Sequence, residues 1–223
     1  MSEANHLNTF LQSSANDHKW IGLNVLDWWE SVFPDQKTKL PSKSVSRDEL
    51  KALCADQAFS DQEAVAAVLA WGGMRRNHGR GLSPNLQKIC RIVASLRSGQ
   101  LTRYEAFSAF YTLRLEGSLT GMSAAYFTKL IFFCAPKHDG YIMDQWTSKS
   151  VNLISGKQVV NLTHAGHVSD HNTATTYIKF CEYVEELSKR GCWTPEETEI
   201  RLFSYGGRNK GEWRSYVIAN WSR

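Results

Sequence analysis

Signals for the start of a helix recur along this chain, and they restrict its fold more than any other feature. In a capping box, a Ser or Thr side chain caps the first turn of a helix while a Glu three residues later bonds back to the backbone of the cap. The pattern occurs at residues 46–49, 60–63 and 102–105. Each occurrence precedes apolar residues at helical spacing, so each predicts the beginning of a helix.

Further helices are predicted without a full capping box. Ser83 followed by Pro84 has the form of an N-cap and a first helical residue. Only short stretches at 141–143 and 158–162 suggest strands. We therefore expect a mainly α protein of about nine helices, with residues 1–19 loosely held. Beyond the capping boxes, the segments with helical spacing are 20–33, 83–97, 122–134, 144–154, 173–189, 194–205 and 212–221.

The chain shows no internal repeat, no low-complexity segment and no Pro- or Ser-rich linker. Its 223 residues suffice for one large domain or for two small lobes packed together. We therefore expect a single compact helical domain with two lobes over residues 1–223. Residues 20–100 and 173–223 are expected to form most of one lobe, and residues 102–155 the other.

Composition limits the class of protein. Hydrophobic residues make up 42% of the chain and charged residues 22%, which is ordinary for a globular protein and unlike a disordered one. The five cysteines include no C-x-x-C pair, which excludes zinc ribbons and clustered iron–sulfur sites and favours reduced, buried thiols. No signal peptide is recognisable, and no apolar run has the length of a membrane span. We expect a cytoplasmic protein with no membrane contact and no cofactor.

Positive charge is concentrated in two stretches that we expect to be Gly-flanked loops, 74–81 and 206–214, although the net charge is only +4. Glycines let a backbone approach a phosphate chain closely, and basic side chains neutralise it, so both stretches are candidate contacts for nucleic acid. Solvated basic loops are the alternative interpretation. The residues concerned are Arg75, Arg76 and Arg80 in the first stretch, and Arg208, Lys210 and Arg214 in the second.

A tight glycine-containing turn, LTGMS, lies at residues 119–123 between two predicted helices. The first N–H groups of a helix have no intrahelical acceptors and lie at the positive end of the helix dipole. Thr120, Gly121, Met122 and Ser123 therefore form a candidate seat for a DNA phosphate, indifferent to base sequence. Other helix–helix turns with a glycine share this pattern.

Two side chains after this turn are candidate catalytic groups. Lys129 lies among apolar residues, and an amine in apolar surroundings loses its charge more readily, which suits nucleophilic attack. The alternatives are a lysine that extends to solvent or pairs with a carboxylate. Asp144 directly precedes a predicted helix, where it is either an ordinary N-cap or a catalytic carboxylate.

Aromatic and histidine side chains give weaker signals. Trp71, Tyr126, Phe132 and Trp146 are candidates for lining a pocket, with core packing as the alternative for each. Residues 164–171 contain three histidines and an aspartate, but they lie in a polar loop without a helical frame. We therefore expect no metal site.

One region of the chain resembles the helix-hairpin-helix DNA glycosylase superfamily. LTGMS at 119–123 is similar to the Leu-Pro-Gly-Val-Gly hairpin of that family, and YIMDQW at 141–146 is similar to the element that carries its catalytic Asp. The spacing from Leu119 to Asp144 matches the 8-oxoguanine glycosylase branch, and the whole chain looks like bacterial proteins described as having that fold. The close match covers residues 102–155.

The chain departs from the family pattern in two places. Thr120 and Ser123 stand where the family hairpin has its Pro and its second Gly, a change that keeps the N–H groups of the turn. Ala125 stands where bifunctional members carry the nucleophilic Lys, and Lys129 lies one helical turn later on nearly the same face.

The resemblance implies a two-lobed helix-hairpin-helix glycosylase fold and a role in base-excision repair of double-stranded DNA. In this interpretation a monomer flips an oxidised purine such as 8-oxoguanine out of the stack. Asp144 assists cleavage of the glycosidic bond, and Lys129 forms an imine that permits strand cleavage, without metal or cofactor. The alternatives are a non-catalytic DNA-binding protein that retained the fold and, less favoured, a helical interaction domain that binds no nucleic acid.

Overall fold

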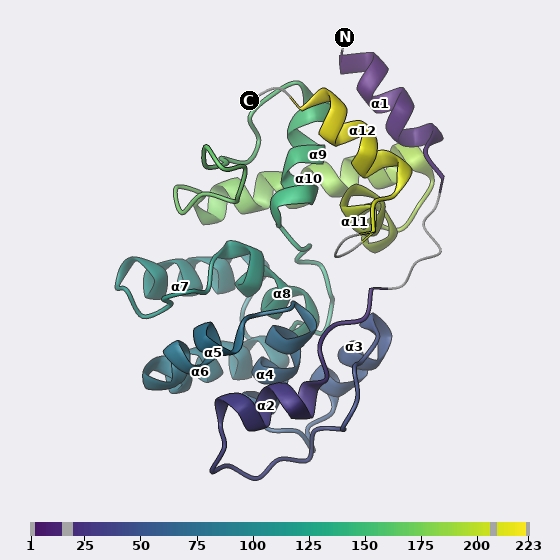
Figure 1. Ribbon diagram of the computed structural model, residues 1–223. Helices are drawn as coiled ribbons and strands as arrows, with labels where there is room; N and C mark the ends of the chain where they lie inside the picture. Colours follow the sequence, from purple (N-terminus) through teal and green to yellow (C-terminus); the bar gives the residue numbers. More distant parts are fainter. Residues whose placement is uncertain (1–2, 15–19, 206–208, 222–223) are drawn as a thin grey trace. The chain divides into compact units, whose positions relative to one another are not determined.

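A computed structural model of the chain describes residues 3–14, 20–205 and 209–221. Figure 1 shows these residues as helices joined by connections of varied length. The mainly α class predicted from the capping boxes and the apolar spacing is therefore confirmed. The elements in chain order are α1 (Glu3–Gln12), α2 (Val25–Val32), α3 (Arg47–Ala55), α4 (Asp61–Trp71), α5 (Arg76–Leu82), the 3₁₀ turn η1 (Ser83–Asn85), α6 (Leu86–Arg97), α7 (Arg103–Leu115), α8 (Ala124–Cys134), α9 (Gln145–Ser155), α10 (Ala174–Gly191), α11 (Pro195–Phe203) and α12 (Glu212–Asn220).

Two helices lie where loops were expected. α1 occupies much of the polar N-terminal stretch and buries Phe10 completely, so the expectation of loosely held residues is wrong there. α5 occupies most of the basic stretch 74–81, which is helical and not a loop. The expectation of about nine helices is accordingly too low. In the described part of the chain, the stretches 141–143 and 158–162 form no strand.

The contacts divide the chain into two compact units. The hairpin unit, named for its α7–α8 connection, comprises residues 20–140. The Asp144 unit comprises the described parts of 1–19 and 141–223. This division separates residues 20–100 from 173–223, which were expected to share a lobe. The reason is local packing, since α4 packs on α6 and α8, whereas α10 packs on α11 and α9.

The hairpin unit is built around α4. Every residue of this helix from Glu63 to Trp71 is buried, and α2, α3, α6 and α8 pack against it. All three predicted capping boxes are formed within this unit, each with both of its reciprocal hydrogen bonds, at the starts of α3, α4 and α7. The sequence signal for these helix starts is therefore confirmed at the level of the side chains.

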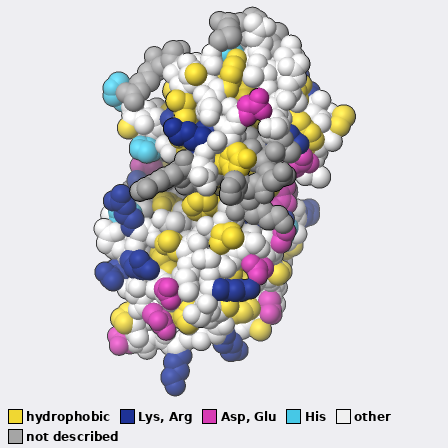
Figure 2. Space-filling model, turned by 45° about the vertical axis from the view of Figure 1, so that its right-hand side comes forward, with side chains coloured by type: hydrophobic (Ala, Val, Ile, Leu, Met, Phe, Trp, Pro, Cys, Tyr) yellow, Lys and Arg dark blue, Asp and Glu magenta, His cyan; other side chains and the backbone are white. Residues whose placement is uncertain are grey.

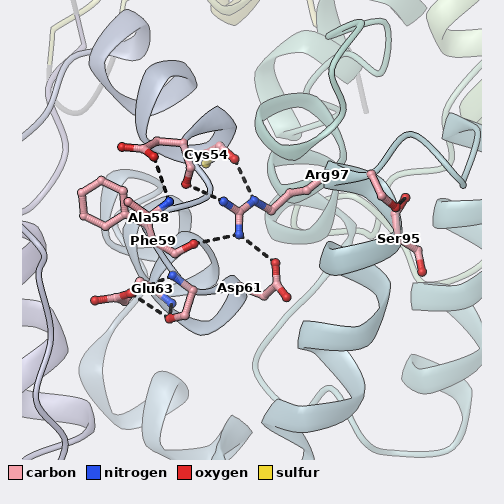
Figure 3. Close-up of polar contacts among 10 residues, drawn as sticks. Cys54, Ala58, Phe59, Asp61, Glu63, Ser95 and Arg97 are labelled. Carbon is pink, nitrogen blue, oxygen red and sulfur yellow. Dashed lines mark hydrogen bonds and ion pairs between the residues drawn. The ribbon is translucent and has the colours of Figure 1, made fainter.

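A buried arginine holds α6 against the connection between α3 and α4, as Figure 3 shows. The side chain of Arg97 is 4% exposed and forms an ion pair of 2.8 Å with Asp61. Its guanidinium also donates to the carbonyl oxygens of Cys54 (2.8 Å), Asp56 (2.7 Å) and Phe59 (3.0 Å). These bonds satisfy carbonyl groups at the end of α3 and in the irregular segment that follows it.

The Asp144 unit is built around α9, which α1, α10, α11 and α12 contact. The hydroxyl of Ser150 on α9 donates to the carbonyl oxygen of Leu202 (2.9 Å) and accepts from Nε1 of Trp213 (2.9 Å). The ring of Phe10 on α1 packs edge-on against Trp213, with 5.0 Å between the ring centroids. Helices from both ends of the chain are thereby fixed on α9, the helix that begins directly after Asp144.

The cysteines are free thiols, and they differ in exposure. Cys54, Cys134 and Cys181 are buried, and burial raises the pKa of the partly buried Cys90 to about 11. Cys192 is exposed, which corrects the expectation of buried thiols for this one residue. No helix within the described ranges is both long enough and apolar enough to cross a membrane.

Candidate active site and nucleic-acid interface

The connection from α7 to α8 is a tight turn anchored from inside. Leu119 and Met122 are fully buried, and the N–H of Met122 donates to the carbonyl oxygen of Leu119 (3.0 Å). Nη1 of Arg114 donates to the same carbonyl (2.8 Å). Gly121 has a φ of +81°, a left-handed conformation that a side chain would strain. The glycine expected for this turn is therefore required by its backbone.

Helix α8 begins directly after the turn, and no side chain caps its first turn. Ser123 is the N-cap residue, and its hydroxyl makes no capping hydrogen bond. The N–H groups of Tyr126 and Phe127 both bond to the carbonyl oxygen of Ser123 (2.9 and 3.2 Å). The amides that precede them in the first turn remain available to an acceptor outside the helix, such as a phosphate oxygen.

Part of the basic stretch 74–81 packs against this turn. A Cβ built on Gly121 would lie only 3.0 Å from Cβ and Cγ of His78 on α5, so the two elements are in close contact. Arg75, at the N-cap of α5, is exposed and acts electrostatically on Tyr126 of α8. Burial raises the pKa of Tyr126, and the charge of Arg75 opposes this rise. One cation of the stretch therefore lies near the start of α8.

The other arginines of the stretch have different surroundings. Arg80 is exposed, and its Nε donates to the carbonyl oxygen of Ser31 on α2 (2.8 Å). Arg76 is exposed at the start of α5. On the face drawn in Figure 2, Lys and Arg side chains lie scattered among acidic and hydrophobic ones and form no continuous basic patch. Of these three arginines, Arg75 is the one whose charge acts on Tyr126 of α8.

Lys129 folds back along α8. Its Nζ donates to the carbonyl oxygen of Ala125, one turn earlier, at 2.6 Å, and lies 5.5 Å from the centre of the Tyr126 ring. The methylene chain passes Gly72 so closely that a Cβ there would lie 3.0 Å from Cδ of the lysine. The side chain is half-buried, and its amine reaches back to the backbone of residue 125.

Two of the four pocket candidates are packed in the hairpin unit. The ring of Trp71 is buried and lies edge-on to Phe133, with 4.8 Å between centroids. Phe132 is fully buried, with the guanidinium of Arg47 at 4.3 Å from its ring centre. Both rings match the core-packing alternative. Tyr126 is half-buried, as is the fourth candidate, Trp146 of the Asp144 unit, so each of these presents some surface.

Asp144 is the N-cap of α9, as its position in the sequence predicted. Its Oδ1 accepts hydrogen bonds from the backbone N–H groups of Trp146 (2.7 Å) and Thr147 (3.0 Å). The backbone N–H of Asp144 donates to Oγ1 of Thr147 (3.0 Å), which completes a capping box. Among the described residues no hydrogen bond engages Oδ2, and the residue is half-buried. The cap therefore fixes one carboxylate oxygen and leaves the other available.

A buried arginine lies near this carboxylate, although the sequence indicated a basic loop at its position. Arg214 on α12 is 3% exposed, and its guanidinium donates to the carbonyl oxygens of Phe203 and Tyr205. Its charge lies 4.8 Å from the ring centre of Trp146. Burial lowers the pKa of Arg214 to about 10, and the Asp144 carboxylate opposes this fall. Arg214 is buried on α12 together with Trp213 and Val217, and no signal in the sequence indicated this.

The remaining sequence candidates are exposed, lie outside the described residues or form no metal cluster. Lys210 is exposed, and Arg208 lies outside the described residues. Thr120 is exposed on the α7–α8 turn, where its hydroxyl donates to the carbonyl oxygen of Gly117 (3.2 Å). Within the described parts of the chain, no cluster of His, Cys, Asp and Glu has the arrangement of a metal site, including the histidines of 164–171.

Comparison with known proteins gives one match. The model of a family described as "Putative 8-oxoguanine DNA glycosylase OGG-like protein" matches residues 18–203. The matched segment includes the α7–α8 turn, Lys129 and Asp144, and it ends before α12 and Arg214. No curated protein and no solved structure matches the chain.

Proposed function

The chain belongs to this OGG-like family, and from that premise we propose that it is a DNA glycosylase that removes oxidised purines such as 8-oxoguanine. Its substrate would be double-stranded DNA carrying one damaged base, bound by a monomer in the cytoplasm. Because the glycosidic bond of a stacked base is out of reach, the base must be flipped out of the duplex, at a cost of a few kcal/mol. The same fold could also serve DNA binding alone.

The observation that carries the proposal is the state of the Asp144 carboxylate. The first turn of α9 holds Oδ1 through two backbone N–H groups, so the orientation of the carboxylate is set before substrate binds. Cleavage of the bond from C1′ to the purine develops positive charge on the deoxyribose. A carboxylate that is already oriented towards the deoxyribose stabilises this developing positive charge. It therefore stabilises the transition state more than the ground state.

The start of α8 supports the docking step. Its uncapped amides and the nearby charge of Arg75 are suited to the phosphates of a DNA backbone. Contacts of this type position the duplex without reading base sequence. A repair enzyme needs this property, because damage occurs in any sequence.

Lys129 supports a second activity, cleavage of the strand. We propose that uncharged Nζ adds to C1′ while the bond from C1′ to the purine nitrogen breaks, and the base leaves with that electron pair and takes up a proton. The nitrogen then passes a proton to O4′ as the C1′–O4′ bond opens, which gives a protonated imine. Loss of a C2′ proton expels the 3′ phosphate, and water hydrolyses the imine to regenerate the amine.

A second candidate function is DNA binding without catalysis. Ala125 occupies the position of the family lysine, and the amine of Lys129 is bonded to the Ala125 carbonyl. A protein that had lost its nucleophile would keep the turn and the DNA contacts and would recognise damaged or distorted DNA without releasing a base.

A labelled duplex with one 8-oxoguanine, incubated with and without borohydride, separates these functions. Borohydride reduces the imine by hydride transfer and leaves a stable covalent complex. Base release together with a complex that is lost in Lys129→Arg supports both proposed activities, and base release without a complex supports the glycosylase alone. Salt-sensitive binding without release from any oxidised purine supports the second candidate. Lys179→Arg, an exposed position on α10, is the matched control.

A further inference from the structure

Gly72 ends α4 and lies against the side chain of Lys129. A Cβ built at position 72 would lie 3.0 Å from Cδ and 3.4 Å from Cε of the lysine. The carbonyl oxygen of Val68 closes the other side of this space at 3.3 Å. A side chain at position 72 would therefore press on the methylene chain of Lys129, which would have to move by at least a few tenths of an ångström.

The backbone does not explain this glycine. Gly72 has φ −69° and ψ −3°, which any residue adopts readily. The next residue is different, because Gly73 has φ +73° and no atom within 4 Å of a built Cβ. Position 73 thus requires glycine for its conformation, whereas a side chain at position 72 would displace the chain of Lys129. The side chain that lies in the space next to Gly72 is that of Lys129.

The path past Gly72 determines where the amine ends. From Gly72 the chain of Lys129 continues to the Ala125 carbonyl oxygen, where Nζ is bound at 2.6 Å. A lysine has four rotatable bonds, and an unconfined chain would leave the amine in many positions. The contact at Gly72 removes some of these positions, and the carbonyl of Ala125 selects among the rest.

From these contacts we propose that Gly72 is a positioning residue for the Lys129 amine. The absence of a side chain at position 72 lets the lysine fold back one helical turn, towards the residue at which the family pattern has its nucleophile. The inference rests on the proposed strand-cleaving activity. It assigns a role to a residue that contacts neither base nor sugar.

The test compares Gly72→Ala and Gly72→Val with Gly81→Ala in the full-length protein. Gly81 has no atom within 4 Å of a built Cβ and no positive φ, so alanine fits there without displacement. We expect the single-turnover rate of borohydride trapping to fall about tenfold in Gly72→Ala, where the lysine must shift only slightly. The larger valine side chain should lower it about a hundredfold, the effect of displacing a reacting group by about 1 Å. Affinity for the lesion duplex should stay unchanged in all three variants.

A second readout needs no activity. Reductive methylation with ¹³C-formaldehyde labels the lysines, and the Lys129 signal is identified by its absence in Lys129→Arg. We expect this signal to shift in both Gly72 variants and to stay in place in Gly81→Ala. If Gly72→Val does not fold, Gly72→Ala, which adds only a methyl group, still allows both the trapping rate and the lysine signal to be measured.

The outcomes distinguish the two proposals. Trapping in the wild type at a rate that the Gly72 variants share overturns the positioning role and leaves the glycosylase intact. No base release by the wild type overturns the proposed function. In that case the ¹³C signal of Lys129 alone decides whether Gly72 positions the amine. An unshifted signal in Gly72→Val would show that the contact does not place the amine.

Discussion

Nζ of Lys129 donates a 2.6 Å hydrogen bond to the carbonyl oxygen of Ala125. This hydrogen bond joins the two residues that distinguish the proposed enzyme from a DNA-binding protein without catalysis. The resemblance to bifunctional glycosylases would place the nucleophilic lysine at Ala125, and Lys129 follows one turn later. The Lys129 side chain runs back towards the start of α8. Its amine therefore lies closer to residue 125 than the one-turn separation of the two Cα atoms would suggest.

Removal of Arg75 should weaken DNA binding more than removal of Arg80. Arg75 acts on Tyr126 near the uncapped start of α8, whereas Arg80 donates to the Ser31 carbonyl on α2. We expect Arg75→Ala to lower affinity for duplexes of any sequence and to reduce the slope of log K against log salt by about 1, the value for one phosphate contact. Fluorescence anisotropy at several salt concentrations measures both, and equal losses in the two variants would contradict the assignment.

Two buried serines on α9 should respond differently to alanine. Ser150 bonds to the Leu202 carbonyl and to Nε1 of Trp213, whereas the hydroxyl of Ser148 is buried and has no hydrogen-bond partner among the described residues. We expect Ser150→Ala to lower the free energy of unfolding by about 2 kcal/mol, because it leaves two buried groups unsatisfied. Ser148→Ala removes an unsatisfied group and should be neutral or stabilising.

Urea denaturation monitored by circular dichroism measures this difference directly. A loss of similar size in both serine variants would mean that the hydroxyl of Ser148 has a partner. The pair is matched, since both residues are on one helix and both are at most 1% exposed.

Glu63 should make the stability of the hairpin unit sensitive to acid. Burial raises the pKa of Glu63, but hydrogen bonds from Lys39, Ser60 and Thr38 outweigh this effect and hold it below the ordinary value of 4.5. A carboxyl group with a lowered pKa in the folded state stabilises the fold above about pH 4.5, and this contribution is lost as the pH falls through the folded-state pKa. Stability should therefore decline on acidification.

The variant Glu63→Gln tests this linkage. An amide can replace only part of the four hydrogen bonds that the carboxylate accepts, so we expect a loss of about 2 kcal/mol at pH 7. The difference from the wild type should narrow in urea titrations as the pH falls below about 4.5, towards the folded-state pKa of Glu63. A difference that stays constant over this range would contradict the ionised state of Glu63. Glu105→Gln, at the exposed capping box of α7, should cost less.

Local signals predicted local structure well. The boxes begun by Ser46, Ser60 and Thr102, and the cap formed by Asp144, depend on residues within three positions of one another, so sequence alone contains them. The glycine of the α7–α8 turn, Gly121, was equally readable, because its left-handed backbone favours one residue type.

Tertiary relationships could not be predicted in this way. The sequence indicated a basic loop for Arg214, which is buried on α12 against Trp146, and gave no sign that Arg97 binds the segment between α3 and α4. α5 begins without a side-chain cap at Arg75, so no start signal marked it. The contact of Gly72 with Lys129 joins helices far apart in the chain, and periodicity within one helix contains no information about it.

The most direct test of the central claim is the rate of base release by Asp144→Asn under single-turnover conditions, on a duplex with one 8-oxoguanine. Asn caps helices as well as Asp does, so the start of α9, the fold and DNA affinity should be preserved while the negative charge is lost. We predict a fall in rate of about a hundredfold or more, the size of effect expected when a pre-oriented electrostatic group is removed. Release at the wild-type rate by Asp144→Asn would contradict the catalytic role of this carboxylate.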